Sequence, residues 1–197
     1  MKKFLSIVLA LGLVGVFAGC SNDTKTSGDT EKADTTTEET AKAETTLDLK
    51  IGRVNNAPHG DKSFATTVVV LNGDKIVAAS IDEFQFLGGE GVKGVPNSDG
   101  AFAEGYKDPK TVLASKLDNA EFYSNMMKEK AGSTKPIDEN YAAIQDYVVG
   151  KTVAELEADL KENEATPEKM VDVVSGATLA DTYGYVNAFV EAAKAAK

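Results

Sequence analysis

Residues 64–81, FATTVVVLNGDKIVAASI, decide the fold class of this chain. Two apolar runs rich in β-branched residues, 64–71 and 76–81, flank the turn signal Asn72-Gly73-Asp74. This pattern predicts a β-hairpin, because Val and Ile suit extended backbone and Asn-Gly suits the tight turn between paired strands. We expect residues 83–86 (EFQF) to extend the second strand.

The chain beyond the hairpin predicts a long loop and then helices. Residues 88–105 are rich in Gly, which is typical of a loop. Apolar residues recur at helical spacing over 110–131 and again over 138–149, with Gly132 as a stop between them. The sequence Thr152-Val-Ala-Glu155 matches a capping box, so we expect a third helix to begin there.

The last part of the chain predicts a short strand followed by a helix. Residues 170–174 (MVDVV) are mostly apolar and fit a strand, while Leu179, Val186 and Val190 recur at helical spacing. Strands and helices in separate blocks predict one α+β domain over 47–197, an antiparallel sheet with flanking helices.

Residues 1–19 predict an export signal. Two lysines precede an apolar run over 4–18, which fits a signal peptide and is short for a membrane span. The sequence Phe17-Ala18-Gly19-Cys20 resembles the bacterial lipobox, in which the cysteine receives a diacylglycerol and becomes the new N-terminus. We therefore expect a lipid on Cys20 to anchor the chain to the extracytoplasmic face of a cell membrane.

The segment 20–46 predicts a tether between this anchor and the domain. Residues 21–46 contain no Val, Ile, Leu or aromatic residue, and Thr, Asp, Glu, Lys and Ala predominate. Such a segment buries too little apolar surface to offset its ordering entropy, so we expect it to be disordered, with a reach on the order of 30 Å. Long polar tethers of this kind suggest a Gram-positive surface.

The composition argues against two classes of function. The net charge is −10 and no basic stripe is present, which argues against nucleic-acid binding because phosphates would be repelled. The chain has one His, which argues against a metal site, and Cys20 as its one Cys allows no internal disulfide.

The segment 172–178 (DVVSGAT) carries the predicted chemistry. Between the expected strand and helix, it brings backbone N–H groups and a hydroxyl to a helix N-terminus, where a phosphate is favoured. Gly176 and Ala177 are small enough for a large group to approach the backbone, and Thr178 offers an oxygen for a bond to phosphorus. The pattern alone favours a plain alternative, in which Ser175 or Thr178 only caps the helix.

This segment resembles the flavinylation motif of the FMN-binding domain family: Asp, two variable residues, Ser or Thr, Gly, Ala, and a final Thr or Ser. The motif positions are filled here by Asp172, Ser175, Gly176, Ala177 and Thr178. In that family a flavin transferase moves FMN from FAD onto the last hydroxyl residue through a phosphoester. The resemblance implies one covalent FMN on Thr178, with Asp172 and Ser175 either recognised by the transferase or positioning the phosphate.

Further stretches resemble the Gram-positive surface flavin lipoproteins of this family, which serve extracellular electron transfer. They are APHGDKSFAT (57–66), VAASIDEFQF (77–86), VPNSDG (95–100), VLASK (112–116), AGSTKPID (131–138) and VSGATLAD (174–181). Those lipoproteins include one with two such domains, whereas this chain has one. The resemblance implies an electron carrier, not a substrate-specific enzyme, that takes electrons from the quinone pool through a membrane dehydrogenase and gives them to extracellular acceptors.

His59, Phe84 and Phe86 are weaker candidates for the flavin pocket. His59 lies in a Pro-His-Gly turn and could face the flavin ring or donate a proton, although a plain loop role is more usual. Phe84 and Phe86 are two residues apart and share one face of a strand, where they pack against either the ring or the core. Phe102 and Tyr106 in the Gly-rich loop could cover the edge of the ring.

Two classes of function stay open on the sequence. The first is the electron-transfer flavoprotein, and the second is a non-redox surface lipoprotein that binds a small ligand or a protein, with SGAT as a helix cap. Flavin that stays attached to the denatured chain separates them. The signal-peptide tail LVGVFAG (13–19) could in addition act as a mating pheromone under either function.

Overall fold

The computed structural model describes residues 47–106 and 108–197. The predicted signal peptide, the lipidated Cys20 and the tether lie outside the described residues. Within the described part, no helix combines the length and the hydropathy that a bilayer crossing requires. The described chain is α+β, with an antiparallel sheet and flanking helices, as the sequence predicted.

The sheet has four strands in the order β1-β2-β3-β4, each antiparallel to its neighbour. Their bounds are β1 Leu49–Asn56, β2 Ser63–Asn72, β3 Lys75–Leu87 and β4 Val112–Ser115. The predicted hairpin is confirmed, since β2 pairs with β3 around a turn in which Gly73 has a φ of 62°. Phe64 pairs with Phe84, so β3 does extend beyond residue 81 as expected.

One face of the sheet builds the core. In β2 the buried side chains alternate at Ala65, Thr67, Val69 and Leu71, as expected for a strand with one covered face. In β3 both Ile76 and Ile81 are buried, although they are five positions apart and a regular strand would place them on opposite faces. The register shift at Val70/Leu71 explains this, because a bulge changes the parity of the residues that face inward.

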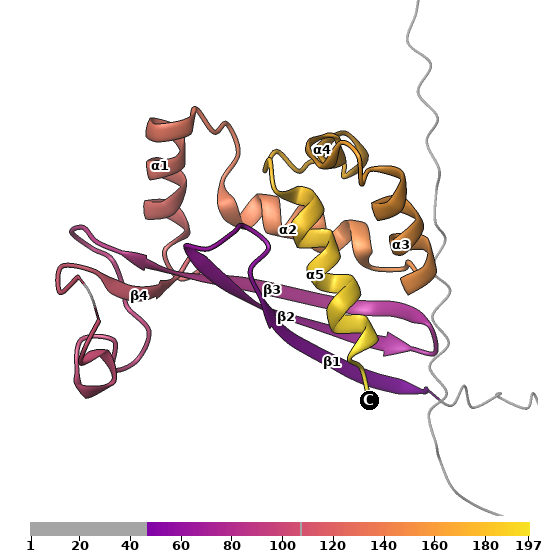
Figure 1. Ribbon diagram of the computed structural model, residues 1–197, viewed down its shortest axis with the longest axis horizontal. Helices are drawn as coiled ribbons and strands as arrows, with labels where there is room; N and C mark the ends of the chain where they lie inside the picture. The colour runs from indigo at the N-terminus through magenta and orange to yellow at the C-terminus, as the bar shows by residue number, and fades with distance from the viewer. Residues whose placement is uncertain (1–46, 107) are drawn as a thin grey trace, which may run out of the picture. The chain divides into compact units, whose positions relative to one another are not determined.

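Helices cover this inner face (Figure 1). They are α1 Ala120–Ala131, α2 Ile137–Val148, α3 Val153–Glu162, the single turn α4 Met170–Val173, and α5 Thr182–Lys194, with the 3-10 turn η2 Pro167–Lys169 before α4. A second 3-10 turn, η1 Ala101–Ala103, lies in the loop between β3 and β4, away from these helices (Figure 1). Helix α5 packs on β1 and β2, and α2 packs on β3. The predicted capping box of α3 is confirmed: the Glu155 N–H donates to Thr152 Oγ1, and the Thr152 N–H donates to the Glu155 carboxylate.

The end of α5 approaches β1 closely. A Cβ at Gly52 would lie 1.8 Å from the Ala192 carbonyl oxygen, so only glycine allows this packing. Beyond the helix, Ile51 and Lys197 exchange two backbone hydrogen bonds, at 3.4 and 3.3 Å. The last residues of the chain are therefore tied to the first strand.

Two predicted elements were wrong. Within 110–131, residues Val112–Ser115 form β4 and the helix begins at Ala120, because the far end of β3 extends past the hairpin and offers backbone groups to pair. Residues 170–174 are not a strand, since Met170–Val173 form a helical turn. Met170 and Val174 are both fully buried while Asp172 between them is exposed; a strand would place all three on one face, so the pattern is that of a helical turn.

Candidate functional site

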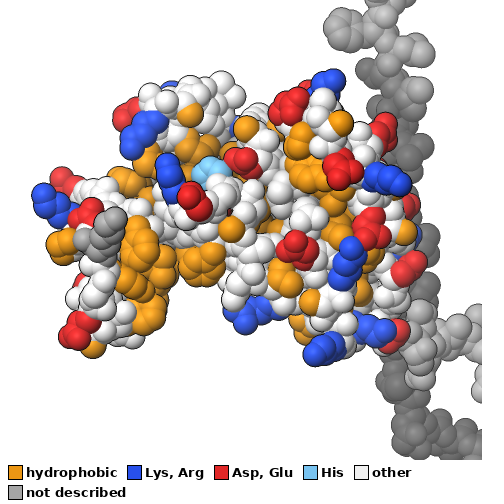
Figure 2. Space-filling model, viewed as in Figure 1, with side chains coloured by type: hydrophobic (Ala, Val, Ile, Leu, Met, Phe, Trp, Pro, Cys, Tyr) orange, Lys and Arg blue, Asp and Glu red, His pale blue; other side chains and the backbone are white. Residues whose placement is uncertain are grey.

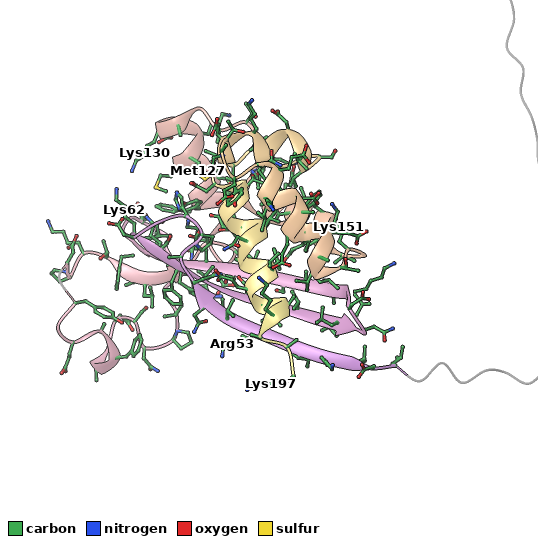
Figure 3. All side chains as sticks on the ribbon, turned by 45° about the vertical axis from the view of Figure 1, so that its right-hand side comes forward. Arg53, Lys62, Met127, Lys130, Lys151 and Lys197 are labelled. Atoms are coloured by element: carbon green, nitrogen blue, oxygen red, sulfur yellow. The ribbon has the colours of Figure 1, made fainter. Side chains whose placement is uncertain are left out.

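A cavity of about 420 Å³ gathers residues from distant parts of the chain. Its wall contains His59 from the β1–β2 loop, Lys116 after β4, Thr178 before α5 and Tyr185 on α5, together with the apolar Met127 and Ile137. In Figure 3 the side chains of Met127 and Lys130 extend from α1 on the same side of the molecule as Lys62 of the β1–β2 loop. A cavity of this size is typical of small-molecule and cofactor sites.

Thr178 is exposed in this wall and is held from behind by Asn140 of α2. The backbone N–H of Thr178 donates to Asn140 Oδ1 at 2.7 Å, and its hydroxyl donates to the same oxygen at 3.1 Å. Asn140 is fully buried, and no pattern in the sequence indicates this role. The hydroxyl is thus held in place and still reachable from outside.

The loop before Thr178 depends on Gly176. Gly176 has a φ of +87°, a conformation that side chains rarely adopt, and a Cβ there would lie 3.3 Å from Lys135 Nζ. The Lys135 ammonium donates to the Gly176 carbonyl at 2.5 Å, which fixes the turn against the start of α2. Ala177 is buried, whereas Asp172 and Ser175 are exposed and lie outside the cavity wall.

The position of the motif relative to α5 differs from the prediction. Helix α5 begins at Thr182, its N-cap is Asp181, and no side chain caps it. Thr178 therefore does not lie at the helix N-terminus, because the chain needs several irregular residues to turn from α4 into α5. The alternative in which Ser175 or Thr178 caps the helix is wrong for the same reason.

A buried ion pair lies behind the cavity wall. Lys116 and Glu83 are 1% and 0% exposed, and the Lys116 ammonium donates to Glu83 Oε2. Tyr141 and Tyr185 also donate to Oε2, at 2.9 and 2.8 Å, and Ser63 donates to Oε1 at 2.6 Å. Burial alone would raise the pKa of Glu83, but the Lys116 charge and these hydrogen bonds hold it below the ordinary value.

The same cluster raises the pKa of both tyrosines. Burial is the main cause for Tyr141 and for Tyr185, and the negative charge of Glu83 adds to it. Both hydroxyls therefore stay protonated and act as donors to the carboxylate. Lys116 Nζ in addition lies 4.6 Å from the centre of the Tyr123 ring, a cation–π contact with another residue of the cavity wall.

His59 lies between this ion pair and the surface. Its Nδ1 is 3.2 Å from Lys116 Nζ, and its Nε2 is 3.6 Å from Asp181 Oδ2. An ammonium has only donors, so we assign Nδ1 as the acceptor and place the proton of the neutral ring on Nε2. Figure 2 shows the histidine at the surface next to an acidic side chain, consistent with its contact with Asp181.

The aromatic candidates lie outside this cavity. Phe84 stacks on Phe64 with ring centres 5.2 Å apart, and Phe86 meets Tyr106 edge-on at 4.8 Å. Phe102 contacts Tyr106 from the other side, at 6.0 Å. These rings form a separate aromatic cluster where the Gly-rich loop folds against the end of β3, and none of them is in the wall that contains Thr178.

The structure thus brings Thr178 and His59 into the wall of one cavity, which also contains Lys116 and Tyr185. Behind this wall, Glu83 is bonded to Lys116 and Tyr185, and Asn140 is bonded to Thr178. The sequence indicated a site role for none of these four additional residues. Lys116 lies in the stretch VLASK (112–116), where nothing indicates that it is buried. Comparisons with family models, with characterised proteins and with solved structures found no match to this chain. The chemistry of the site therefore has to be argued from its geometry.

Proposed function

We propose that this protein is an electron-transfer flavoprotein that carries one FMN, linked through its phosphate to Thr178 Oγ1. The observation that supports this most directly is the place of Thr178. Thr178 is the final residue of the DVVSGAT segment. It is exposed in the wall of a cavity of about 420 Å³, and its hydroxyl caps no helix. A hydroxyl that is held at a cavity by Asn140 and caps no helix suits covalent attachment of a cofactor.

The cavity wall fits the parts of FMN. Tyr123, Met127 and Ile137 offer apolar and aromatic surface for a flat ring system, and Thr178 is at hand for the phosphate. Lys116 offers a positive charge to the polar edge of the ring, and His59 covers the approach from solvent. When bound, FMN supplies the redox chemistry, since a flavin takes up electrons singly or in pairs and releases them singly.

The protein's own residues would set how the flavin behaves. The Lys116–Glu83 pair is net neutral and fixed by the hydroxyls of Tyr141 and Tyr185, so the ammonium is held in place without extra charge in the core. Such a preorganised dipole at the cavity would tune the redox potential of a bound flavin without a large rearrangement. No acid–base residue is required for electron transfer itself.

The cellular setting of this proposal comes from the sequence. A lipid on Cys20 and a polar tether would keep the domain at the outer face of a membrane, and a flavin transferase would mature it. Electrons would come from the quinone pool through a membrane dehydrogenase and pass to extracellular acceptors. A covalent link suits this setting, because a lost cofactor could not be replaced outside the cell.

The test is to co-express the full chain with an exported flavin transferase and to look for flavin after denaturation. We expect fluorescence that stays with the protein on a denaturing gel, and the added mass of one FMN less one water on the tryptic peptide 170–194. Thr178→Ala should abolish both signals, whereas Ser175→Ala, which alters an exposed hydroxyl outside the cavity, tests whether the modification is selective.

An unmodified chain, with the transferase shown active on another substrate, would contradict the proposal. The cavity would then support the alternative, a non-redox surface lipoprotein that binds a small ligand without a covalent bond.

A further inference from the structure

Asn140 makes contacts that the flavin proposal does not use. Its Oδ1 accepts both hydrogen bonds that Thr178 donates, from the backbone N–H at 2.7 Å and from the hydroxyl at 3.1 Å. Asn140 is 0% exposed, so its amide is shielded from water, whereas Thr178 itself is exposed. One buried side chain therefore fixes both the backbone and the reactive atom of Thr178.

The orientation of the Asn140 amide is determined by its partners. Its Nδ2 donates to the carbonyl oxygens of Pro136 at 2.9 Å and Lys135 at 3.2 Å. A flipped amide would bring its oxygen against these two carbonyls and its NH₂ group against the Thr178 N–H, which only donates. Asn140 thus presents an acceptor, and only an acceptor, to Thr178.

We infer that Asn140 is a positioning residue for the attachment of the flavin, an inference that rests on the proposed function. Because the Thr178 hydrogen is directed to Asn140, the lone pairs of Oγ1 are directed away from it, to the side from which a phosphoryl group would approach. After attachment Oγ1 has no hydrogen to donate, but the Thr178 N–H still donates to Asn140. The same residue therefore orients the hydroxyl before the reaction and anchors the modified residue afterwards.

The step itself balances with FAD as the donor. A bond forms between Thr178 Oγ1 and the phosphorus of the FMN half, the phosphoric anhydride bond of FAD breaks, and AMP leaves with the bridging oxygen. The hydroxyl proton has to go to a base, and an amide oxygen is not one. Among the described residues the Thr178 hydroxyl has Asn140 as its hydrogen-bond partner, so the base comes from the transferase.

Two substitutions separate positioning from a merely structural role. Asn140→Ala removes the acceptor for Thr178 together with the donor to the Pro136 and Lys135 carbonyls. Asn140→Asp, as the protonated acid that burial beside two carbonyls favours, keeps an acceptor oxygen for Thr178 and one O–H donor for these carbonyls. Lys135→Met is the matched control, because it removes another bond that holds the same loop, the one to the Gly176 carbonyl. Full-length chains are incubated with FAD and a flavin transferase, and the rate of covalent attachment is followed by in-gel fluorescence and peptide mass.

We expect Asn140→Ala to lower the rate at saturating acceptor by about tenfold to a hundredfold, the range for a reacting group that has lost its orientation. The KM for the acceptor chain should change little, since Asn140 is buried and does not meet the transferase. Asn140→Asp should stay closer to wild type than Asn140→Ala, and Lys135→Met should have the smaller effect. Near-ultraviolet circular dichroism identifies any variant that has lost its fold.

Three results would overturn this inference. One is a wild-type rate for Asn140→Ala, the second is an Asn140→Asp variant as slow as Asn140→Ala, and the third is an equal loss in Lys135→Met. If the wild-type chain itself takes up no flavin, the proposed function fails instead, so the two failures are distinguishable.

Discussion

Replacing Lys116 by Met tests the buried ion pair behind the cavity. The substitution leaves Glu83 charged, fully buried and without its cation. Breaking a buried pair from one side typically costs about 3–5 kcal/mol, because the remaining charge is uncompensated. Glu83 keeps the hydroxyl donors of Ser63, Tyr141 and Tyr185, so we expect a cost at the lower end, about 3 kcal/mol.

The assay is reversible denaturation of the wild type and the Lys116→Met variant at neutral pH. For a domain of this size, a loss of about 3 kcal/mol lowers the melting temperature by about 6–12 °C. The double variant Glu83→Gln/Lys116→Met removes both charges and should be more stable than Lys116→Met alone, since replacing a whole buried pair is often neutral. A single-variant cost below about 1 kcal/mol, or a double variant less stable than the single one, would refute this account of the pair.

The pH dependence of the free energy of unfolding provides an independent test of this ion pair. The pKa of Glu83 in the folded protein is below its ordinary value of 4.5, so the group stabilises the fold at higher pH. This contribution is lost as the pH falls from 4.5 through the folded pKa. Lys116→Met removes the main cause that lowers the pKa and leaves burial, which raises it, so the stability difference between the variant and the wild type should narrow as the pH falls and Glu83 takes up a proton. If the free energy of unfolding of the variant and of the wild type changed in the same way with pH below neutral, the coupling between Lys116 and Glu83 would be contradicted.

Three further substitutions test local features by denaturant unfolding. Gly52→Ala should destabilise the fold by about 3 kcal/mol or more, because its Cβ would lie 1.8 Å from the Ala192 oxygen. Gly100→Ala is the control and should be near neutral, because the nearest atom to its Cβ would be 3.8 Å away. Equal effects of the two substitutions would contradict the close packing at Gly52. Gly176→Ala should cost about 1–2 kcal/mol, because φ is +87°, and should slow flavin attachment; a neutral result would mean that the loop adapts. Thr152→Ala should cost about 1 kcal/mol by removing the capping box of α3, and Thr152→Ser should restore most of it.

The sequence predicted the elements whose signals are local. The β2–β3 hairpin, the α2 helix and the capping box of α3 are each encoded within a few residues, by a turn or by a periodic pattern. Residues 112–115 were predicted as helix because their strand depends on pairing with β3, which the local pattern does not contain. Residues 170–174 are too few for their spacing to separate a strand from a helical turn.

The residues of the candidate site likewise fall into those with a local signal in the sequence and those without one. Thr178 was found through a contiguous motif, whereas its partner Asn140 lies 38 residues earlier in the chain. Glu83 and Tyr185 are 102 residues apart, and nothing in either neighbourhood indicates that they share a hydrogen bond. Polar residues that become a site only through tertiary contacts carry no local signal. The cluster behind the cavity could therefore not be predicted from one sequence.

The bonds between Ile51 and Lys197 bear on the order in which the chain can fold. Synthesis delivers β1, β2 and β3 first, and the hairpin can form as soon as it emerges, because its contacts are local. The part of the inner face formed by β1 and β2 stays uncovered until α5 has been made, since this helix packs on both strands. A nascent chain of this domain thus exposes apolar side chains of β1 and β2 until α5 is made, and such transiently exposed surface is prone to aggregation.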